Sequence, residues 1–211
     1  MVSAAHCSIK MKKIGIMGGT FDPPHIGHMA MAQRVFETMQ LDSVLFIPTG
    51  GVYYKDSSHM LPPKTRLSMV RAAVADNDHF VADAIEAESG RDSYTYQTLE
   101  KLQKKYADAE LVFIVGADSL DYMDSWREPE RIFSVCHVAA VNRTGISERE
   151  LIEKKRQLEE MYNAGITLVN MPVLNVSSTQ LRTWVRQGHS IRYWVPEAVF
   201  QYIQQHRLYT D

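Results

Sequence analysis

Residues 18–28 read GGTFDPPHIGH and follow directly after a short apolar run at residues 14–17. Glycines at the end of a strand let the backbone turn sharply and approach a ligand closely. The cluster of Asp22, Pro23 and Pro24 suits the end of a turn and the start of a helix, whose free amide groups attract an anion. This stretch therefore predicts a strand, a loop and a helix that together bind phosphate.

Two histidines belong to the same stretch. His25 and His28 are three positions apart around Gly27, so at a helix start both rings can point to one side and donate to phosphate oxygens. The plainer interpretation is that Asp22 only forms a turn and that the histidines are ordinary surface residues. Two histidines and three glycines within eleven residues, at a change from strand to helix, favour the phosphate site.

The rest of the chain alternates short β-rich runs with longer segments of helical period, which is typical of a parallel sheet covered by helices. Runs such as LFI and LVFIV are apolar at consecutive positions, as in strands buried on both faces. We therefore expect an α/β fold in a single domain at residues 11–211, preceded by a flexible extension at residues 1–10. The predicted strands are residues 14–17, 43–47, 80–85, 110–115, 135–141 and 166–169.

Helical segments lie between these runs. Ser147 and Glu150 form a capping box for a helix through residues 151–162, whose alternating charges indicate a solvated face. Residues 49–64 contain glycines, prolines, serines and tyrosines and are predicted to form a functional loop. Apolar residues recur at helical spacing at Leu67, Val70 and Val74, and at Leu99, Leu102 and Tyr106.

Composition excludes several classes of protein. Of 211 residues, 45% are hydrophobic and 23% charged, which is typical of a globular protein. The formal charge of -2 gives the surface as a whole no attraction to nucleic acid or to an acidic membrane. No apolar run spans a bilayer, and Cys7 and Cys136 are too few for a disulfide scaffold. We expect a cytoplasmic protein.

Other phosphate and metal motifs are absent. The chain has no GxxxxGK[ST], no GxGxxG and no HExxH, so a Walker loop, the ordinary dinucleotide fingerprint and a zincin site are not expected. A histidine pair without a third ligand is weak support for zinc. Mg²⁺ held mainly by the phosphates of a triphosphate fits better, with no protein metal site.

The segment HIGH resembles the (T/H)xGH signature of a nucleotidyltransferase superfamily with a Rossmann-like sheet. Residues 176–182, VSSTQLR, are similar to that superfamily's second motif, [IV]SSTxxR. The residues support this independently, because Ser177 or Ser178 can cap a helix and Arg182 carries a fork for phosphate oxygens. A plain Ser-capped helix would explain the serines but not the pairing with HIGH.

Further stretches resemble one branch, the bacterial nicotinate-nucleotide adenylyltransferases. SYT at residues 93–95, VGADSL at 115–120 and the ending VPEAVFQYIQQHRLY all match in order. One departure is the loop, where VYYK replaces PPHK, so Tyr53 and Tyr54 precede the lysine. Singly, the matched residues have ordinary interpretations: Trp126 as a core aromatic, Lys55 as a surface lysine and Asp118 as a helix cap.

The resemblance implies attack of a nucleotide 5′-phosphate on the α-phosphorus of ATP, giving a dinucleotide and pyrophosphate. It implies catalytic roles for His25, His28, Lys55 and Arg182. The implied contacts with ATP are Gly18, Gly19, Thr20, Phe21, His25, His28, Gly116, Asp118, Val176, Ser177, Ser178, Thr179 and Arg182. The implied contacts with the pyridine nucleotide are Lys55, Ser93, Tyr94, Thr95, Trp126 and Arg143.

The expected partners are therefore ATP, with Mg²⁺, and nicotinate mononucleotide; nucleic acid and membranes are not expected, and a homo-oligomer stays open. Three alternatives remain. A phosphopantetheine adenylyltransferase shares the two motifs but lacks the SYT and tryptophan pair. A nucleotide sensor without catalysis would not need both histidines and Arg182, and a metal-dependent phosphohydrolase would need ligands that the sequence does not bring together.

Overall fold

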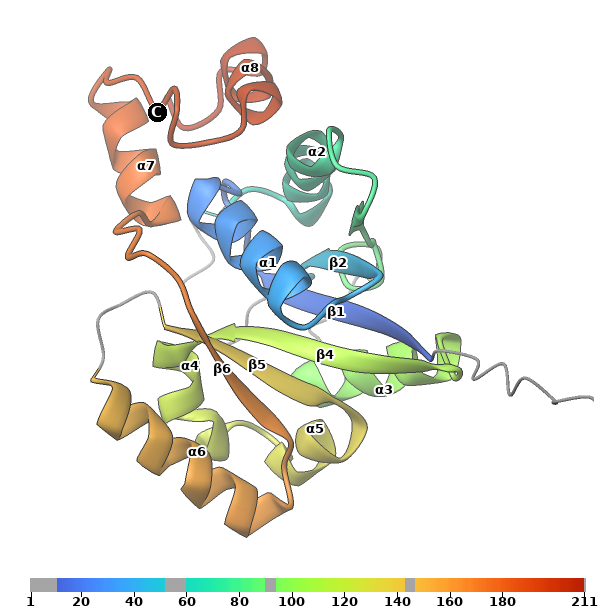
Figure 1. Cartoon of the computed structure of the whole chain (residues 1–211). Helices are drawn as coiled ribbons and strands as arrows, with labels where there is room; N and C mark the ends of the chain where they lie inside the picture. Colours follow the sequence, from blue (N-terminus) through green and yellow to red (C-terminus); the bar gives the residue numbers. More distant parts are fainter. Residues whose placement is uncertain (1–10, 52–59, 90–93, 143–146, 211) are drawn as a thin grey trace, which may run out of the picture.

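The protein folds around one parallel sheet (Figure 1). The computed structural model describes residues 11–51, 60–89, 94–142 and 147–210; the predicted extension at 1–10 lies outside them. The six strands pair in the order β3-β2-β1-β4-β5-β6, and every pairing is parallel. Their bounds are β1 (Lys12–Gly19), β2 (Ser43–Pro48), β3 (Phe80–Ala82), β4 (Ala109–Gly116), β5 (His137–Asn142) and β6 (Ile166–Asn170).

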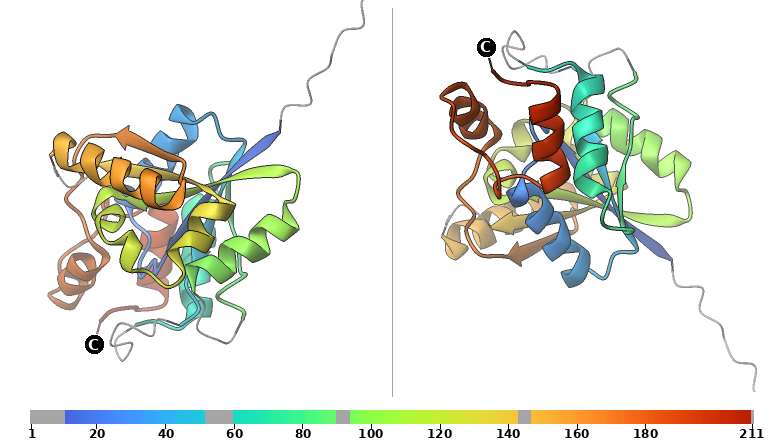
Figure 2. Two further views of the ribbon diagram at one scale, coloured as in Figure 1. Left: turned by 90° about the horizontal axis from the view of Figure 1, so that it is seen from below. Right: turned by 90° about the horizontal axis from the view of Figure 1, so that it is seen from above.

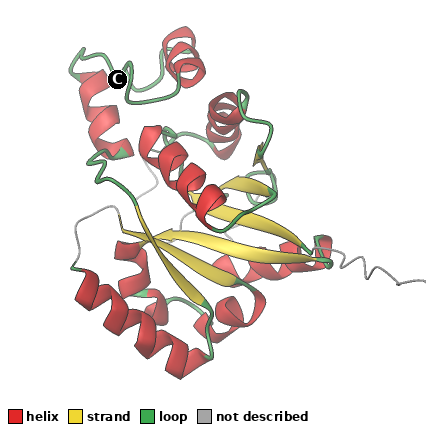
Figure 3. Ribbon diagram, viewed as in Figure 1, coloured by secondary structure: helices red, strands yellow, loops and turns green. Residues whose placement is uncertain are grey.

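Helices cover both faces of the sheet (Figure 2). One face carries α1 (Ile26–Thr38) and α2 (Pro63–Val74). The opposite face carries α3 (Thr95–Lys105), α4 (Ala117–Asp121), α5 (Pro129–Val135) and α6 (Glu148–Tyr162), with a 3-10 turn, η1 (Met123–Ser125), after α4. After β6 the chain crosses back to the side of α1, where α7 (Ser178–Arg186) and α8 (Glu197–Gln205) lie; α8 packs against α2 (Figure 3).

The prediction of strands buried on both faces is confirmed. In β4, Leu111 and Phe113 join the apolar cluster under α3, α5 and α6, whereas Val112 and Ile114 join the cluster under α1 and α2. All four side chains are at most 6% exposed. The predicted α/β class, a Rossmann-like parallel sheet with flanking helices, is therefore the observed fold.

β1 extends beyond the predicted residues 14–17 to Lys12–Gly19, because its two ends still pair with β4 and β2. Two further predicted boundaries are wrong. β3 ends at Ala82, not residue 85, because the Asp83 side chain accepts a hydrogen bond from the amide of Ile85 and turns the chain. β5 begins at His137, not residue 135, because Val135 ends α5 and Cys136 follows it. Burial hides this second boundary, since Cys136 is 8% exposed and the apolar pattern runs without a break from helix to strand.

The predicted capping box is confirmed at the start of α6. The Ser147 hydroxyl accepts from the Glu150 amide, and the Glu150 carboxylate accepts from the Ser147 amide. The predicted loop at 49–64 ends earlier than expected, because α2 begins at Pro63. Residues 52–59 of that loop lie outside the described residues.

Candidate active site

The two neighbouring strands β1 and β4 define the site. The strand order reverses between them, and in open α/β sheets ligands bind beyond the carboxyl ends of the strands at such a switch point. Residues 18–28 extend from the end of β1, and the segment after Gly116 extends from the end of β4. The predicted phosphate loop therefore lies where the topology favours a ligand.

The glycines at the end of β1 do not make the sharp turn that their type predicts. Gly18 and Gly19 continue the strand, pairing with Ile47 and Pro48 of β2. The chain turns afterwards, at Phe21, whose φ is 51°, and at the cis peptide bond between Asp22 and Pro23. A Cβ on Gly18 would meet no atom within 4 Å, so the strand end leaves open space there.

His25 and His28 come together as predicted. Their rings stack at a centroid distance of 3.7 Å and an interplanar angle of 26°. The His25 amide donates to Nδ1 of His28 over 3.2 Å. A neutral His28 ring therefore carries its proton on Nε2, which makes that nitrogen the donor available to a ligand.

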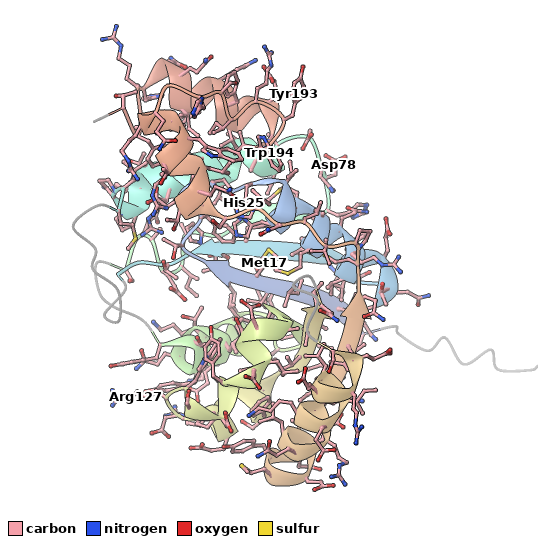
Figure 4. The ribbon with its side chains drawn as sticks, turned by 90° about the vertical axis from the view of Figure 1, so that its left-hand side faces the viewer. Met17, His25, Asp78, Arg127, Tyr193 and Trp194 are labelled. Atoms are coloured by element: carbon pink, nitrogen blue, oxygen red, sulfur yellow. The ribbon has the colours of Figure 1, made fainter. Side chains whose placement is uncertain are left out.

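The free amide groups expected at the start of α1 are in part already used. The Ile26 amide donates to the carbonyl oxygen of Trp194 over 3.0 Å, and the His28 amide donates to the His25 carbonyl. Figure 4 shows His25 near the segment that carries Tyr193 and Trp194. Fewer backbone amide groups are therefore available to an anion at the start of α1 than the sequence predicts.

Phe21 supports the histidines from within the core. Its ring is 2% exposed and contacts the His28 ring edge-on at a centroid distance of 5.0 Å. Any contact of Phe21 with ATP must therefore come from its backbone. Gly27 has a close-packing role, because a Cβ there would lie 3.1 Å from both the His25 ring and the side chain of Val176.

The second motif contacts the first. Ser177 is the N-cap of α7 and accepts from the Gln180 amide, whereas the Ser178 hydroxyl donates to the carbonyl oxygen of Pro23 over 2.9 Å. Arg182 Nη1 donates to the carbonyl oxygen of Asp22 over 2.8 Å. Segments about 155 residues apart in the chain thus form one site.

Arg182 retains hydrogen-bonding capacity. Its Nη2 donates to the hydroxyl of Thr179 over 3.3 Å. Its Nε is buried and has no hydrogen-bond partner within the described ranges of the chain. A buried donor without a partner is costly, and a phosphate oxygen would supply the acceptor.

Residues that the sequence did not single out hold this loop in place. Arg66 is 1% exposed and donates to the carbonyl oxygens of Thr20, Thr49, Gly50 and Leu61. Burial lowers the pKa of Arg66, and the negative charge of Asp22 opposes that shift. A charged residue next to the apolar positions of α2 was the available signal, but its partners come from distant segments.

The carboxylate of Asp22 is the second structural element that the sequence missed. Asp22 is 2% exposed; its Oδ1 accepts from the Tyr209 hydroxyl over 2.6 Å, and its Oδ2 accepts from the Leu61 amide over 3.3 Å. Its place in the sequence predicts only that Asp22 ends a turn and starts a helix. The structure gives its side chain specific partners that follow it in the chain by 39 and 187 residues.

The predicted pyridine-nucleotide residues line two adjoining cavities on the side of the sheet that carries α3. Tyr94, Thr95 and Trp126 border both. The first cavity, of about 280 Å³, also includes Arg127. The second, of about 160 Å³, extends to the end of β1 and is lined there by Gly18, Gly19 and Thr20. This second cavity joins the predicted substrate residues to the phosphate loop.

Trp126 is held by aromatic contacts, edge-on to Phe113 at 6.2 Å and tilted against Tyr122 at 6.3 Å between ring centroids. Arg127 donates to the hydroxyl of Tyr94 over 2.8 Å, and its guanidinium lies 4.5 Å from the centre of that ring. Sequence reasoning missed Arg127, although a cation next to Trp126 was a visible signal.

Glu86 lines the second cavity and was also missed. It is 8% exposed, and its Oε1 accepts from the Thr98 hydroxyl over 2.7 Å.

After β4, Gly116 is the N-cap of α4 and Asp118 lies in the first turn of that helix, so Asp118 is not the cap. Three predicted site residues, Lys55, Ser93 and Arg143, lie outside the described residues, as do Tyr53 and Tyr54.

The described residues contain neither a cluster of metal ligands nor a membrane-spanning helix. In these parts of the chain no three His, Cys, Asp or Glu side chains gather as metal ligands. None of the helices described is both long and apolar enough to cross a bilayer.

Comparison with known proteins identifies relatives over almost the whole chain. Residues 16–184 match the family model described as cytidylyltransferase-like. A protein of Lachnoclostridium phytofermentans named "Probable nicotinate-nucleotide adenylyltransferase" is 38% identical over 94% of this chain and 100% of its own length. One of the same name from Exiguobacterium sibiricum is 43% identical over 93% of this chain and 98% of its own length.

Solved structures agree with the fold. The Plasmodium falciparum nicotinic acid mononucleotide adenylyltransferase complexed with NaAD superposes with a TM-score of 0.76 at 18% identity, over 94% of this chain and 97% of that one. The same enzyme complexed with APC gives a TM-score of 0.73 at 17% identity over the same shares. At this level of identity the likeness supports the architecture.

Proposed function

Since the chain belongs to the cytidylyltransferase-like family and, within it, to the nicotinate-nucleotide adenylyltransferases, we propose that it joins ATP to nicotinate mononucleotide. The products are nicotinic acid adenine dinucleotide and pyrophosphate, a step of NAD biosynthesis. The observation that best supports a phosphate reaction at this site is the contact between its two motifs. Arg182 is held on the carbonyl of Asp22, in the loop that leads to the two stacked histidines.

The reaction is a transfer of the adenylyl group. An oxygen of the mononucleotide 5′-phosphate forms a bond to the α-phosphorus of ATP, and the bond from that phosphorus to the bridging oxygen of the β-phosphate breaks. Pyrophosphate leaves with the electron pair. Because the attacking oxygen is already an anion near neutral pH, no base is needed, and catalysis depends on positioning and on charge stabilisation.

The residues on the ATP side are suited to stabilise the charge that grows on the phosphates. His28 offers Nε2–H, since its Nδ1 is already engaged by the His25 amide. Arg182 offers its buried Nε. We assign Lys55 to the incoming phosphate and Gly116 and Asp118 to the ATP ribose, as the family resemblance implies.

The residues on the pyridine side are suited to an acidic ring substituent. Tyr94 is the N-cap of α3, and its side chain makes no capping bond, so the positive end of the helix dipole is not masked by that residue. Arg127 adds a cation to the first cavity, whereas Glu86 borders only the second. We assign ring stacking to Trp126, and further contacts with the nucleotide to Ser93 and Arg143.

Mg²⁺ would enter with ATP. The donors of the ATP side are a guanidinium and imidazole N–H groups, which fit phosphate oxygens and not a metal ion. Bound Mg²⁺ would offset negative charge on the triphosphate. We place the reaction in the cytoplasm, consistent with a chain that has two cysteines, of which the described one, Cys136, is a free thiol.

One assay tests the proposal. The purified protein is given Mg·ATP with nicotinate mononucleotide, nicotinamide mononucleotide or phosphopantetheine, and pyrophosphate release is recorded. We expect release with nicotinate mononucleotide. Release with phosphopantetheine alone would assign the chain to the sister adenylyltransferases, and ATP binding without release would favour a sensor.

A further inference from the structure

Tyr209 follows α8 and reaches back into the centre of the phosphate loop. Its hydroxyl donates to Oδ1 of Asp22 over 2.6 Å, although the two residues are 187 positions apart. The backbone of Tyr209 has a φ of 64°, a left-handed conformation that side-chain-bearing residues rarely adopt. Such strain persists where the surrounding contacts hold it, and here the contact is the buried Asp22 carboxylate.

The hydroxyl is a permanent donor. Burial, followed by the negative charge of Asp22, raises the pKa of Tyr209 far above its ordinary range. The bond from a neutral hydroxyl to a buried carboxylate is charge-assisted and therefore stronger than a neutral pair. Asp22 in turn connects three segments, because its Oδ2 accepts from the amide of Leu61 and its carbonyl oxygen accepts from Arg182.

We propose that Tyr209 is a positioning residue for the ATP side of the site: its hydroxyl fixes Asp22, and Asp22 fixes Arg182. This inference rests on the proposed function, since it assumes that Arg182 binds the triphosphate. Without the hydroxyl, the Asp22 carboxylate loses one partner and the carbonyl that holds Arg182 is free to shift. The effect is specific to ATP, because Tyr94, Thr95 and Trp126 belong to the opposite side of the sheet and share no hydrogen bond with Asp22 in the part of the chain that the structure describes.

The test compares Tyr209→Phe with Tyr202→Phe. Tyr202 is a matched control: it lies in α8, packs in the same apolar cluster and stacks on His206, but its hydroxyl makes no hydrogen bond within the described residues. Pyrophosphate release is measured with Mg·ATP varied at saturating nicotinate mononucleotide, and then with the mononucleotide varied. For Tyr209→Phe we expect kcat/KM for ATP to fall about tenfold with the KM for the mononucleotide unchanged. Tyr202→Phe should match the wild type.

A second measurement separates positioning from folding. In an Asp22→Asn background, the Tyr209→Phe substitution should lower kcat/KM for ATP by a much smaller factor than in the wild type, because the charge-assisted bond is already weakened. Equal losses in both backgrounds, equal rises in both KM values together with a lower Tm, or an unchanged Tyr209→Phe enzyme would each overturn the inference. A wild-type protein that releases no pyrophosphate would overturn the proposed function and this inference with it.

Discussion

The two sides of the site are held together by different forces. On the ATP side, buried charged and polar groups tie the loop down: Arg66 binds four backbone carbonyls, and Asp22 accepts from Tyr209. On the pyridine side, Trp126, Phe113 and Tyr122 meet through ring contacts around open cavities. Figure 4 shows the two sides apart, with His25 above the sheet and Arg127 below it.

This difference matches the role that we propose for each side. Displacement at phosphorus requires donors held within a fraction of an ångström, and buried hydrogen bonds with many partners provide that precision. Recognition of a flat ring requires an aromatic side chain that stacks on its face and contacts at its edge, and such contacts tolerate small shifts in the position of the ring. Substitutions on the ATP side should therefore reduce kcat strongly, whereas those on the pyridine side should change the choice of substrate.

The largest expected effect is that of His28→Ala. Its Nε2–H is proposed to stabilise charge in the transition state, so kcat should fall by about 10²–10³ while the fold stays intact. The control is His189→Ala, which removes an exposed histidine after α7. A purified His28→Ala enzyme with a folded spectrum and near-normal kcat would show that the ring only caps and packs α1.

The next effect concerns the acid and amide forms of the substrate. The two ring substituents differ little in size, so discrimination must come from charge, and the start of α3 favours an anion. An amide would place its own donors against protein donors, each unmet pairing costing roughly 1–3 kcal/mol. We expect kcat/KM for nicotinate mononucleotide to exceed that for nicotinamide mononucleotide by at least ~10². Equal values, or a preference for the amide, would reject this argument.

Arg182→Lys tests the ATP side with the charge retained. Lysine cannot contact the Asp22 carbonyl and a phosphate oxygen at the same time in the fork geometry of arginine. We expect kcat/KM for ATP to fall by about one to two powers of ten. Arg186→Lys, one turn further along α7 and exposed, should leave it unchanged. If KM for ATP and kcat both stay at wild-type values, Arg182 is not part of the site.

Arg127→Gln tests the pyridine side in the same way. Arg127 is exposed and solvent screens its charge. Its removal should therefore lower the ratio of kcat/KM for nicotinate mononucleotide to kcat/KM for nicotinamide mononucleotide by only about two- to fivefold. The kinetic constants for ATP should not change. Arg149→Gln, an exposed site in α6, serves as the control. An undiminished ratio would leave the start of α3 as the source of the preference.

The sequence was sufficient for the elements that depend on local pattern. Apolar runs predicted every strand, and Ser147 with Glu150 predicted the start of α6, because both signals lie within a few residues. Errors occurred where a local pattern continued across a boundary, as at Val135 and Cys136. The prediction of a sharp turn at Gly18 and Gly19 was wrong for a different reason, because the conformational freedom of glycine permits a turn but does not require one.

The contact between the two motifs could be predicted from the sequence, but the hydrogen bonds that hold the loop in place could not. His25 stacks on His28, and Arg182 contacts the loop that precedes them, as expected. For Arg66 the only local signal is a charge next to the apolar positions of α2, and Tyr209 has none, since a tyrosine after a helix is common. Their roles follow from partners that lie as far as 187 residues away, which only the folded chain brings into contact.

The smallest expected effect lies outside both sides of the site, at the amino end of β5. His137 is half-buried there, with Nε2 2.8 Å from the hydroxyl of Thr167. Burial lowers the pKa of His137 below its ordinary value of 6.5. Nearby charges act in both directions: the acidic residues Glu110 and Glu159 raise the pKa, and Lys13 and Lys155 lower it.

The sign of the pH dependence follows from that depressed pKa. Below pH 6.5 the unfolded chain takes up a proton that folded His137 does not. The contribution of this residue to stability is therefore complete above pH 6.5 and is lost as the pH falls through the lower, folded value. His137→Gln should flatten the decline of Tm over this window, whereas His206→Gln, at an exposed histidine, should not. Because His137 is remote from both motifs, kcat per folded molecule should match the wild type at each pH. A decline in kcat for His137→Gln would mean that the amino end of the sheet is coupled to the site.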